Sequence, residues 1–195
     1  EVTAAMQALG LQGGRFDIQV GAAGKDSLSD HGADSIEFLV SANPGQPLQA
    51  LGKVASGGEL SRISLAIQVV AARDTDIPTL IFDEVDTGVG GAVAETVGRQ
   101  LQALGMHHQI LCVTHLAQVA AQAHHHLQVQ KTRSKSRTQT RVERLDTQQR
   151  IDEIARMLGG QKITASTRQH AQEMLMMAPL PAGEDELRKE REEER

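Results

Sequence analysis

The chain of 195 residues is long enough for one domain with a core of its own. Hydrophobic residues make up 39% of it, with no Trp or Tyr and three Phe, so the core must be built from aliphatic side chains, Ala and Met. This scarcity of rings argues against a base-stacking surface for nucleic acids. The formal net charge of -5 excludes a global basic field that would attract DNA.

The N-terminal part predicts one short helix and two strands. Residues 1–10 favour a helix that ends at Gly10. Apolar and polar residues then alternate over 15–20 and again over 35–40, which is the period of half-buried strands. A polar loop separates the two strands, and this indicates an antiparallel pair.

From Gly57 the pattern changes to alternating helices and strands, typical of an α/β fold with a parallel sheet. Short apolar runs predict strands that are buried on both faces, and amphipathic periodicity predicts the helices between them. The expected elements are a helix over 59–72, a strand over 79–82, a helix over 91–104, a strand over 109–113, a short helix over 116–123 and a strand over 127–130.

The C-terminal part is less regular. Residues 131–144 contain six Lys or Arg and one acid, which favours a solvated hairpin rim, with contact to DNA phosphates as the alternative. Two helices are expected over 151–158 and 164–177. Residues 184–195 hold eleven charges and one apolar residue, so we expect a solvated tail there.

The sequence also favours an intracellular protein. Cys112 is the only cysteine and lies in an apolar run, which predicts a small buried side chain and a reducing compartment. No run approaches the roughly 18 apolar residues of a membrane span, and no secretory leader opens the sequence. We therefore expect a cytoplasmic location.

The strongest chemical signal is the run TLIFDE at 79–84. An apolar strand that ends in two acids presents them at the carboxyl edge of the sheet, where α/β proteins bind ligands. Nucleotide hydrolysis needs one carboxylate to hold Mg²⁺ and another to orient or deprotonate water. Asp83 suits the first role and Glu84 the second. For an isolated match, a solvated acidic turn is the alternative.

Two further motifs have the residue types that contact phosphate. In SGGE at 56–59, paired glycines let backbone N–H groups approach an anion at the positive end of a helix. An ordinary helix cap at Ser56 is the alternative. In VTH at 113–115, His115 follows a buried strand and could reach a phosphate at the sheet edge, although a lone histidine there is more often structural.

The order and spacing of these motifs resemble the signature, Walker B and switch-histidine motifs of ABC-type ATPases. Their flanking residues narrow the resemblance. KVASGGELSRISLAIQ, TLIFDEVDTGVGG, VTHLAQVAAQA and RIDEIARMLGG are similar to the RecN family of SMC-related bacterial DNA-repair proteins. The likeness runs from about Met6 to Ala178.

The resemblance implies an ATPase head formed from both ends of a longer chain, which are joined through a coiled-coil arm. Residues 1–10 would then be the foot of the arm, 11–178 the C-terminal lobe of the ABC/SMC-type head, and 179–195 a charged tail. ATP and Mg²⁺ are the implied cofactors. The implied partners are the N-terminal half of the same head, a second head in a homodimer, and DNA in the nucleoid, with no membrane.

The resemblance also implies how the site residues divide between two nucleotides. Ser56, Gly57, Gly58 and Glu59 would meet the ATP bound to the opposite head. In the site of their own head, Asp83 would hold Mg²⁺ through water, Glu84 would act on the attacking water and His115 on the γ-phosphate. Many SMC relatives have Asp at the position of Gly90, so the residue that makes the corresponding contact across the two heads stays open.

One motif is absent from the sequence. The Walker A loop, G-x-x-x-x-G-K-[ST], holds the β- and γ-phosphates. The nearest string, GAAGKD at 21–26, has glycines too close together and Asp26 in place of the Mg²⁺-binding hydroxyl. We therefore expect the chain alone to bind and hydrolyse no ATP.

Two other function classes share parts of this pattern. The nucleotide-binding subunit of an ABC transporter has the same motif order, but VDTGVGG at 85–91 lacks the Ser-x-Leu-Asp pattern usual there. A non-catalytic dimerisation module is the third interpretation.

Overall fold

The computed structural model describes residues 1–22, 32–54, 56–72, 75, 77–83, 85–134, 137–160 and 163–178, without the side chains of 133, 134, 137 and 138. In chain order its elements are α1 (Val2–Ala8), β1 (Arg15–Ala22), β2 (Asp34–Ser41), β3 (Gln49–Ala50), the 3-10 helix η1 (Leu51–Lys53), α2 (Gly57–Ala72), β4 (Thr79–Asp83), α3 (Gly91–Leu104), β5 (Gln109–Val113), α4 (Ala117–Ala120), β6 (Leu127–Ser134), β7 (Arg137–Arg144), α5 (Thr147–Gly159) and α6 (Ala165–Met177).

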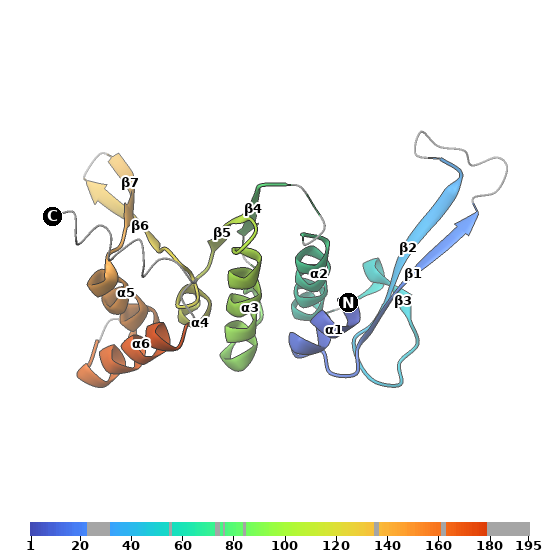
Figure 1. Cartoon of the computed structure of the whole chain (residues 1–195), viewed down its shortest axis with the longest axis horizontal. Helices are drawn as coiled ribbons and strands as arrows, with labels where there is room; N and C mark the ends of the chain where they lie inside the picture. The colour runs from blue at the N-terminus through green and yellow to red at the C-terminus, as the bar shows by residue number, and fades with distance from the viewer. Residues whose placement is uncertain are drawn as a thin grey trace.

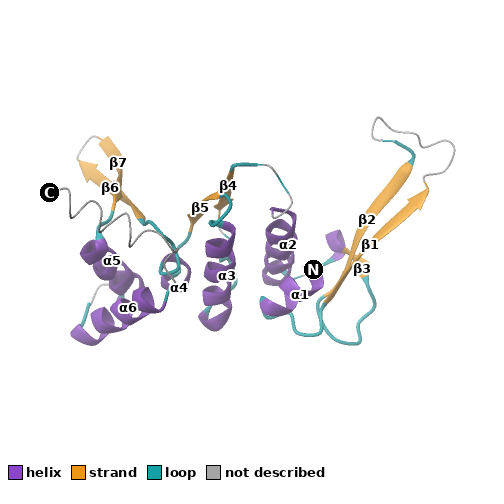
Figure 2. Ribbon diagram, viewed as in Figure 1, coloured by secondary structure: helices purple, strands orange, loops and turns teal. Residues whose placement is uncertain are grey.

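These elements form an elongated row rather than a sphere. Figure 1 shows the sheet of β1, β2 and β3 at one end, α2 and α3 with β4 and β5 in the middle, and the β6–β7 hairpin with α5 and α6 at the other end. Figure 2 shows that helices lie on the same side of the strands along most of the row. In the described part, no helix is long and apolar enough to cross a membrane.

The N-terminal sheet confirms the predicted antiparallel pair and corrects its burial. β1 and β2 pair antiparallel, with Ile18 opposite Phe38 and Val20 opposite Ile36. All four of these side chains are exposed, whereas Phe16 and Val40 of the same row pack in the main core. The expectation of half-buried strands is therefore confirmed where β1 begins and β2 ends and is wrong for the rest of the pair, which no described element covers.

The central sheet is parallel, as predicted, but it is covered on one face only. β4 pairs with β5 in register, with Phe82 beside Cys112 and Ile81 beside Leu111. Phe82 is buried in the core, whereas Ile81 is 69% exposed and Leu111 and Val113 are also exposed. The expectation that these strands are buried on both faces is therefore wrong for this chain. Cys112 is half-buried rather than buried.

Two hydrophobic cores hold the row together. The larger one joins α1, α2, β4 and α3 through side chains that include Met6, Ile63, Val97 and Leu101. The smaller one joins α4, α5 and α6 around Ile154, which is fully buried. The first of these cores lies directly under the carboxyl ends of β4 and β5 and fixes their position.

The strand expected over 127–130 does not belong to the parallel sheet. β6 pairs antiparallel with β7 in a separate two-stranded sheet, with Leu127 opposite Arg144 and Val129 opposite Val142. The apolar-polar alternation of 127–130 fits a hairpin with one open face equally well, so the strand, but not its partner, could be read from the pattern.

Candidate functional site

The SGGE segment forms the start of α2. The Glu59 backbone N–H donates a long hydrogen bond of 3.4 Å to Ser56 Oγ, and the Leu60 N–H donates to the Ser56 carbonyl oxygen at 2.9 Å. Ser56 therefore caps the helix, which is the structural role that the sequence also allowed. Ser56 and Gly57 are exposed and Gly58 is half-buried. A long helix with an open glycine start retains the positive end that attracts anions.

The loop after β4 lies directly on this helix start. Gly88 has φ +74°, and a Cβ at that position would lie 3.2 Å from the Cα of Gly58. Both the positive φ and the backbone-to-backbone approach require glycine at 88. The SGGE segment and the loop after the acidic strand are thus in contact, although about 30 residues separate them in the sequence.

Asp83 ends β4 on the exposed face of the sheet, in the same row as Ile81 and next to Val113 of β5. Together with Ser61 and Ser64 of α2 it lines a shallow cleft between the helix and the strand. A solvated carboxylate beside hydroxyl groups has the oxygen donors that Mg²⁺ prefers. Glu84, the expected base, lies outside the described residues.

Thr114 and His115 follow β5 at the same edge of the sheet, because parallel strands end together. Both residues contact Asp86, in the loop after β4. Asp86 Oδ2 accepts hydrogen bonds from Thr114 Oγ1 at 2.5 Å and from the His115 backbone N–H at 3.1 Å. His115 Nδ1 lies 3.4 Å from the same oxygen, and the ring itself is 74% exposed. The backbone of His115 is thus bonded to Asp86, whereas its imidazole ring is exposed to solvent.

Asp86 was not singled out in the sequence. It is 1% exposed, in a loop that also contains Glu, Gly, Thr and Val, and a single sequence has no signal that separates a buried acid from a solvated one. The only hint in the sequence was the position of Asp86, three residues after Asp83 and before the predicted helix over 91–104.

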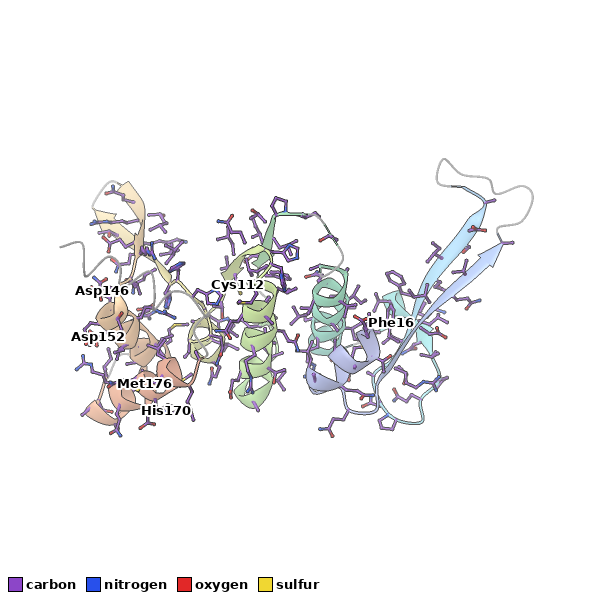
Figure 3. All side chains as sticks on the ribbon, viewed as in Figure 1. Phe16, Cys112, Asp146, Asp152, His170 and Met176 are labelled. Atoms are coloured by element: carbon purple, nitrogen blue, oxygen red, sulfur yellow. The ribbon has the colours of Figure 1, made fainter. Side chains whose placement is uncertain are left out.

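The electrostatics of this edge are negative. Burial, followed by the charges of Asp86 and Asp83, raises the pKa of the Cys112 thiol from its ordinary 9.0 to about 11. Figure 3 shows Cys112 on β5 beside α3. Burial, the larger cause, disfavours a charged group of either sign, whereas the two carboxylates contribute negative charge close to the sheet edge.

The structure therefore brings three expected groups around one loop. Gly58 touches it, Asp83 precedes it, and His115 is bonded to it through Asp86. The rejected string GAAGKD begins within β1 and then leaves the described part of the chain, so its first two residues belong to a strand and not to a phosphate-binding turn.

Comparisons with known proteins show which family this sequence resembles. The chain is 51% identical over 177 residues to the DNA repair protein RecN of Vibrio cholerae, a match that covers 91% of this chain and 32% of that protein. It is 50% identical over 167 residues to RecN of Xylella fastidiosa, covering 86% of this chain and 30% of that protein. For RecN of Bacillus subtilis the identity is 46% over 151 residues, covering 77% and 26%. The chain thus spans about a third of the length of these relatives.

Solved structures show the same fold. The Smc head domain with a coiled coil and joint from Pyrococcus yayanosii superposes with a TM-score of 0.60 at 19% identity, over 78% of this chain and 27% of that one. A chain from a study of SMC ATPases, which dimerise with ATP and are activated by DNA, superposes with a TM-score of 0.54 at 16% identity, over 83% and 93%. No family model matches the sequence. On the RecN matches, which cover most of its length, the chain belongs to the RecN family of DNA repair proteins.

Proposed function

We propose that this chain is the C-terminal lobe of the ATPase head of a RecN-type protein that repairs DNA double-strand breaks. One observation carries the proposal. Asp83 and His115 follow adjacent parallel strands at one sheet edge, and the glycine-rich start of α2 touches the loop between them. A phosphate-bearing ligand with Mg²⁺ matches Asp83 and His115, and the glycine-rich helix start beside them matches the phosphate of a second nucleotide.

The residues at this edge suit ATP and Mg²⁺. Asp83 is solvent-exposed at the carboxyl end of β4 and would hold Mg²⁺ through water. Glu84, next in the chain, would orient or deprotonate the attacking water. His115, whose ring is open to solvent, would contact the γ-phosphate. The bound metal would neutralise charge that develops on the phosphates.

The SGGE segment would act on a different nucleotide from these three residues. Ser56, Gly57, Gly58 and Glu59 would meet the ATP held by a second head, so that two heads clamp together when ATP is bound and separate after hydrolysis. The exposure of Ser56 and Gly57 at a helix N-terminus supports this assignment. Each chain would thus supply parts of two sites.

The chain would need the N-terminal half of the head to complete either site. Its sequence has no Walker A loop, and the described part leaves apolar rows open on the β1–β2 and β4–β5 sheets. Exposed rows of this kind mark surfaces that a partner covers. We therefore infer that the chain alone neither binds nor hydrolyses ATP. Micromolar ATP binding by the isolated chain in calorimetry would contradict this.

The flanking regions fit the same scheme. α1 packs on α2 through the buried Met6, as expected if residues 1–10 are the foot of a coiled-coil arm. The tail over 179–195 lies outside the described residues. Contact with DNA through the basic β6–β7 hairpin stays a proposal. Its test is the salt dependence of DNA binding after replacement of Arg133, Lys135 and Arg137 by Ala, positions whose side chains are outside the described part.

The transporter alternative is not favoured, because the relatives at 46–51% identity quoted for this chain are RecN proteins. An experiment distinguishes an ATPase from the alternative of a non-catalytic dimerisation module. Co-expression with the N-terminal half should restore ATP hydrolysis, and Glu84→Gln should abolish it. Glu173→Gln, an exposed carboxylate on α6, is the matched control and should leave the rate unchanged. If hydrolysis survives Glu84→Gln, another residue is the base; if none is restored at all, the ATPase assignment fails.

A further inference from the structure

Asp86 is a buried carboxylate that the proposed chemistry does not use. It is 1% exposed and lies three residues beyond the proposed Mg²⁺ ligand Asp83, in the loop that crosses from β4 to α3. Removing a carboxylate from water is strongly unfavourable unless hydrogen bonds replace the lost solvation. A buried acid here is therefore maintained by specific contacts, and those contacts indicate its role.

Within the described part of the chain, the hydrogen bonds of the Asp86 carboxylate converge on one short segment. Thr114 Oγ1 and the His115 backbone N–H both donate to Asp86 Oδ2, and His115 Nδ1 lies 3.4 Å from that oxygen. Thr114 Oγ1 in turn accepts the Leu116 N–H at 3.0 Å, which closes a tight turn around the histidine. Asp86 Oδ1 has no hydrogen-bond partner among the residues that the structure describes.

We propose that Asp86 is a positioning residue for His115, an inference that rests on the proposed role of His115 at the γ-phosphate. The carboxylate fixes the backbone of His115 through a hydrogen bond from its N–H, and it lies 3.4 Å from Nδ1, within ion-pair distance of the ring. A carboxylate this close favours the ring orientation that keeps Nδ1 beside Oδ2. Carboxylates orient functional imidazoles in this way in metal and hydrolytic sites.

The same contacts would also exist if Asp86 only tied two loops together. The two roles differ in what they predict for a chain that lacks the histidine. A positioning residue acts through the ring, so its loss has no further effect once the ring is gone. A purely structural residue lowers activity in either background.

The test uses the full-length protein and measures kcat and KM for ATP. Asp86→Asn, which keeps the shape of the side chain, should lower kcat by about 10- to 100-fold, as loss of an orienting partner typically does, with a change in KM of less than about threefold. In the His115→Ala background the same substitution should change kcat by less than about twofold. Asp152→Asn, a solvent-accessible carboxylate on α5 that pairs with Arg168, is the matched control and should behave as wild type.

A second variant covers the case in which Asp86→Asn does not fold. Thr114→Val keeps the carboxylate and removes one donor, and should produce a smaller loss of kcat that also disappears in the His115→Ala background. Equal losses with and without His115 would overturn the positioning role and leave the proposed function intact. Wild-type kcat in His115→Ala itself would instead refute the role of the histidine, and with it this inference.

Discussion

The open face of β4 gives a quantitative prediction for head assembly. Ile81 is 69% exposed in this chain, although full burial of such a side chain contributes about 1.5–3 kcal/mol. If the N-terminal half covers it, about two thirds of that value, or roughly 1–2 kcal/mol, is gained only on association. Ile81→Ala should therefore weaken binding of the N-terminal half by about 5- to 30-fold, and should leave the stability of the chain itself almost unchanged.

Calorimetric titration of the separately produced halves measures the first effect, and a urea titration of each variant measures the second. Val142→Ala is the matched control, because Val142 is 58% exposed but lies on the β6–β7 hairpin. It should not change the dissociation constant. Two results would refute the reasoning: unchanged affinity for Ile81→Ala, or a loss of stability in the isolated chain as large as the loss of affinity.

Three further predictions concern the chain by itself. Gly88→Ala should lower the free energy of unfolding by about 1–3 kcal/mol in urea, because φ there is +74° and the new Cβ meets backbone, whereas Gly52→Ala, with no atom within 4 Å, should change it by less than about 0.5 kcal/mol. Asp146→Ala should remove the capping box of α5 and cost about 1 kcal/mol, more than Asp152→Asn in the same assay. Cys112 should react with a disulfide reagent about 100-fold more slowly at pH 8 than a thiol of pKa 9.0, because a pKa of about 11 leaves little thiolate, and the rate should rise with pH until about 11. A reaction rate that does not change with pH would contradict the raised pKa. The same pKa shift predicts a contribution to stability that is complete below pH 9 and lost as pH rises through 11, which urea titrations at several pH values measure.

The pattern of apolar and polar residues predicted helices and strands accurately in segments where a single periodicity was clear. The helix over 91–104 and the strand over 109–113 were placed to the residue, because amphipathic and continuous apolar runs there have sharp ends. Helix α5 begins at Thr147 rather than at 151, because its first turn is polar and is formed by the cap at Asp146 rather than by an apolar stripe. Apolar periodicity has no means of detecting such a turn.

The sequence pattern could not predict which strand faces are buried or which strands pair with each other. The alternation over 15–20 and 127–130 reports which side chains share a face, but not whether anything in this chain covers that face. Asp86 shows the same limit for the site. Asp83 and His115 were identified from spacing and resemblance, whereas the residue that bonds to His115 was visible only once β4 and β5 were placed side by side.

The open apolar row and the incomplete site share one physical cause. Residues two apart on a strand face the same way, so Ile81 and Asp83 of β4 point from the same face, and Val113 of β5 lies beside Asp83. A partner that covers Ile81 must therefore come to rest next to the carboxylate proposed to hold Mg²⁺. The element that brings phosphate-binding groups to Asp83 would then be the same one that buries the apolar row. If the proposed N-terminal half is that partner, assembly of the head and formation of the nucleotide site would be a single event. Ile81→Ala should then raise KM for ATP in the reassembled head as it weakens association.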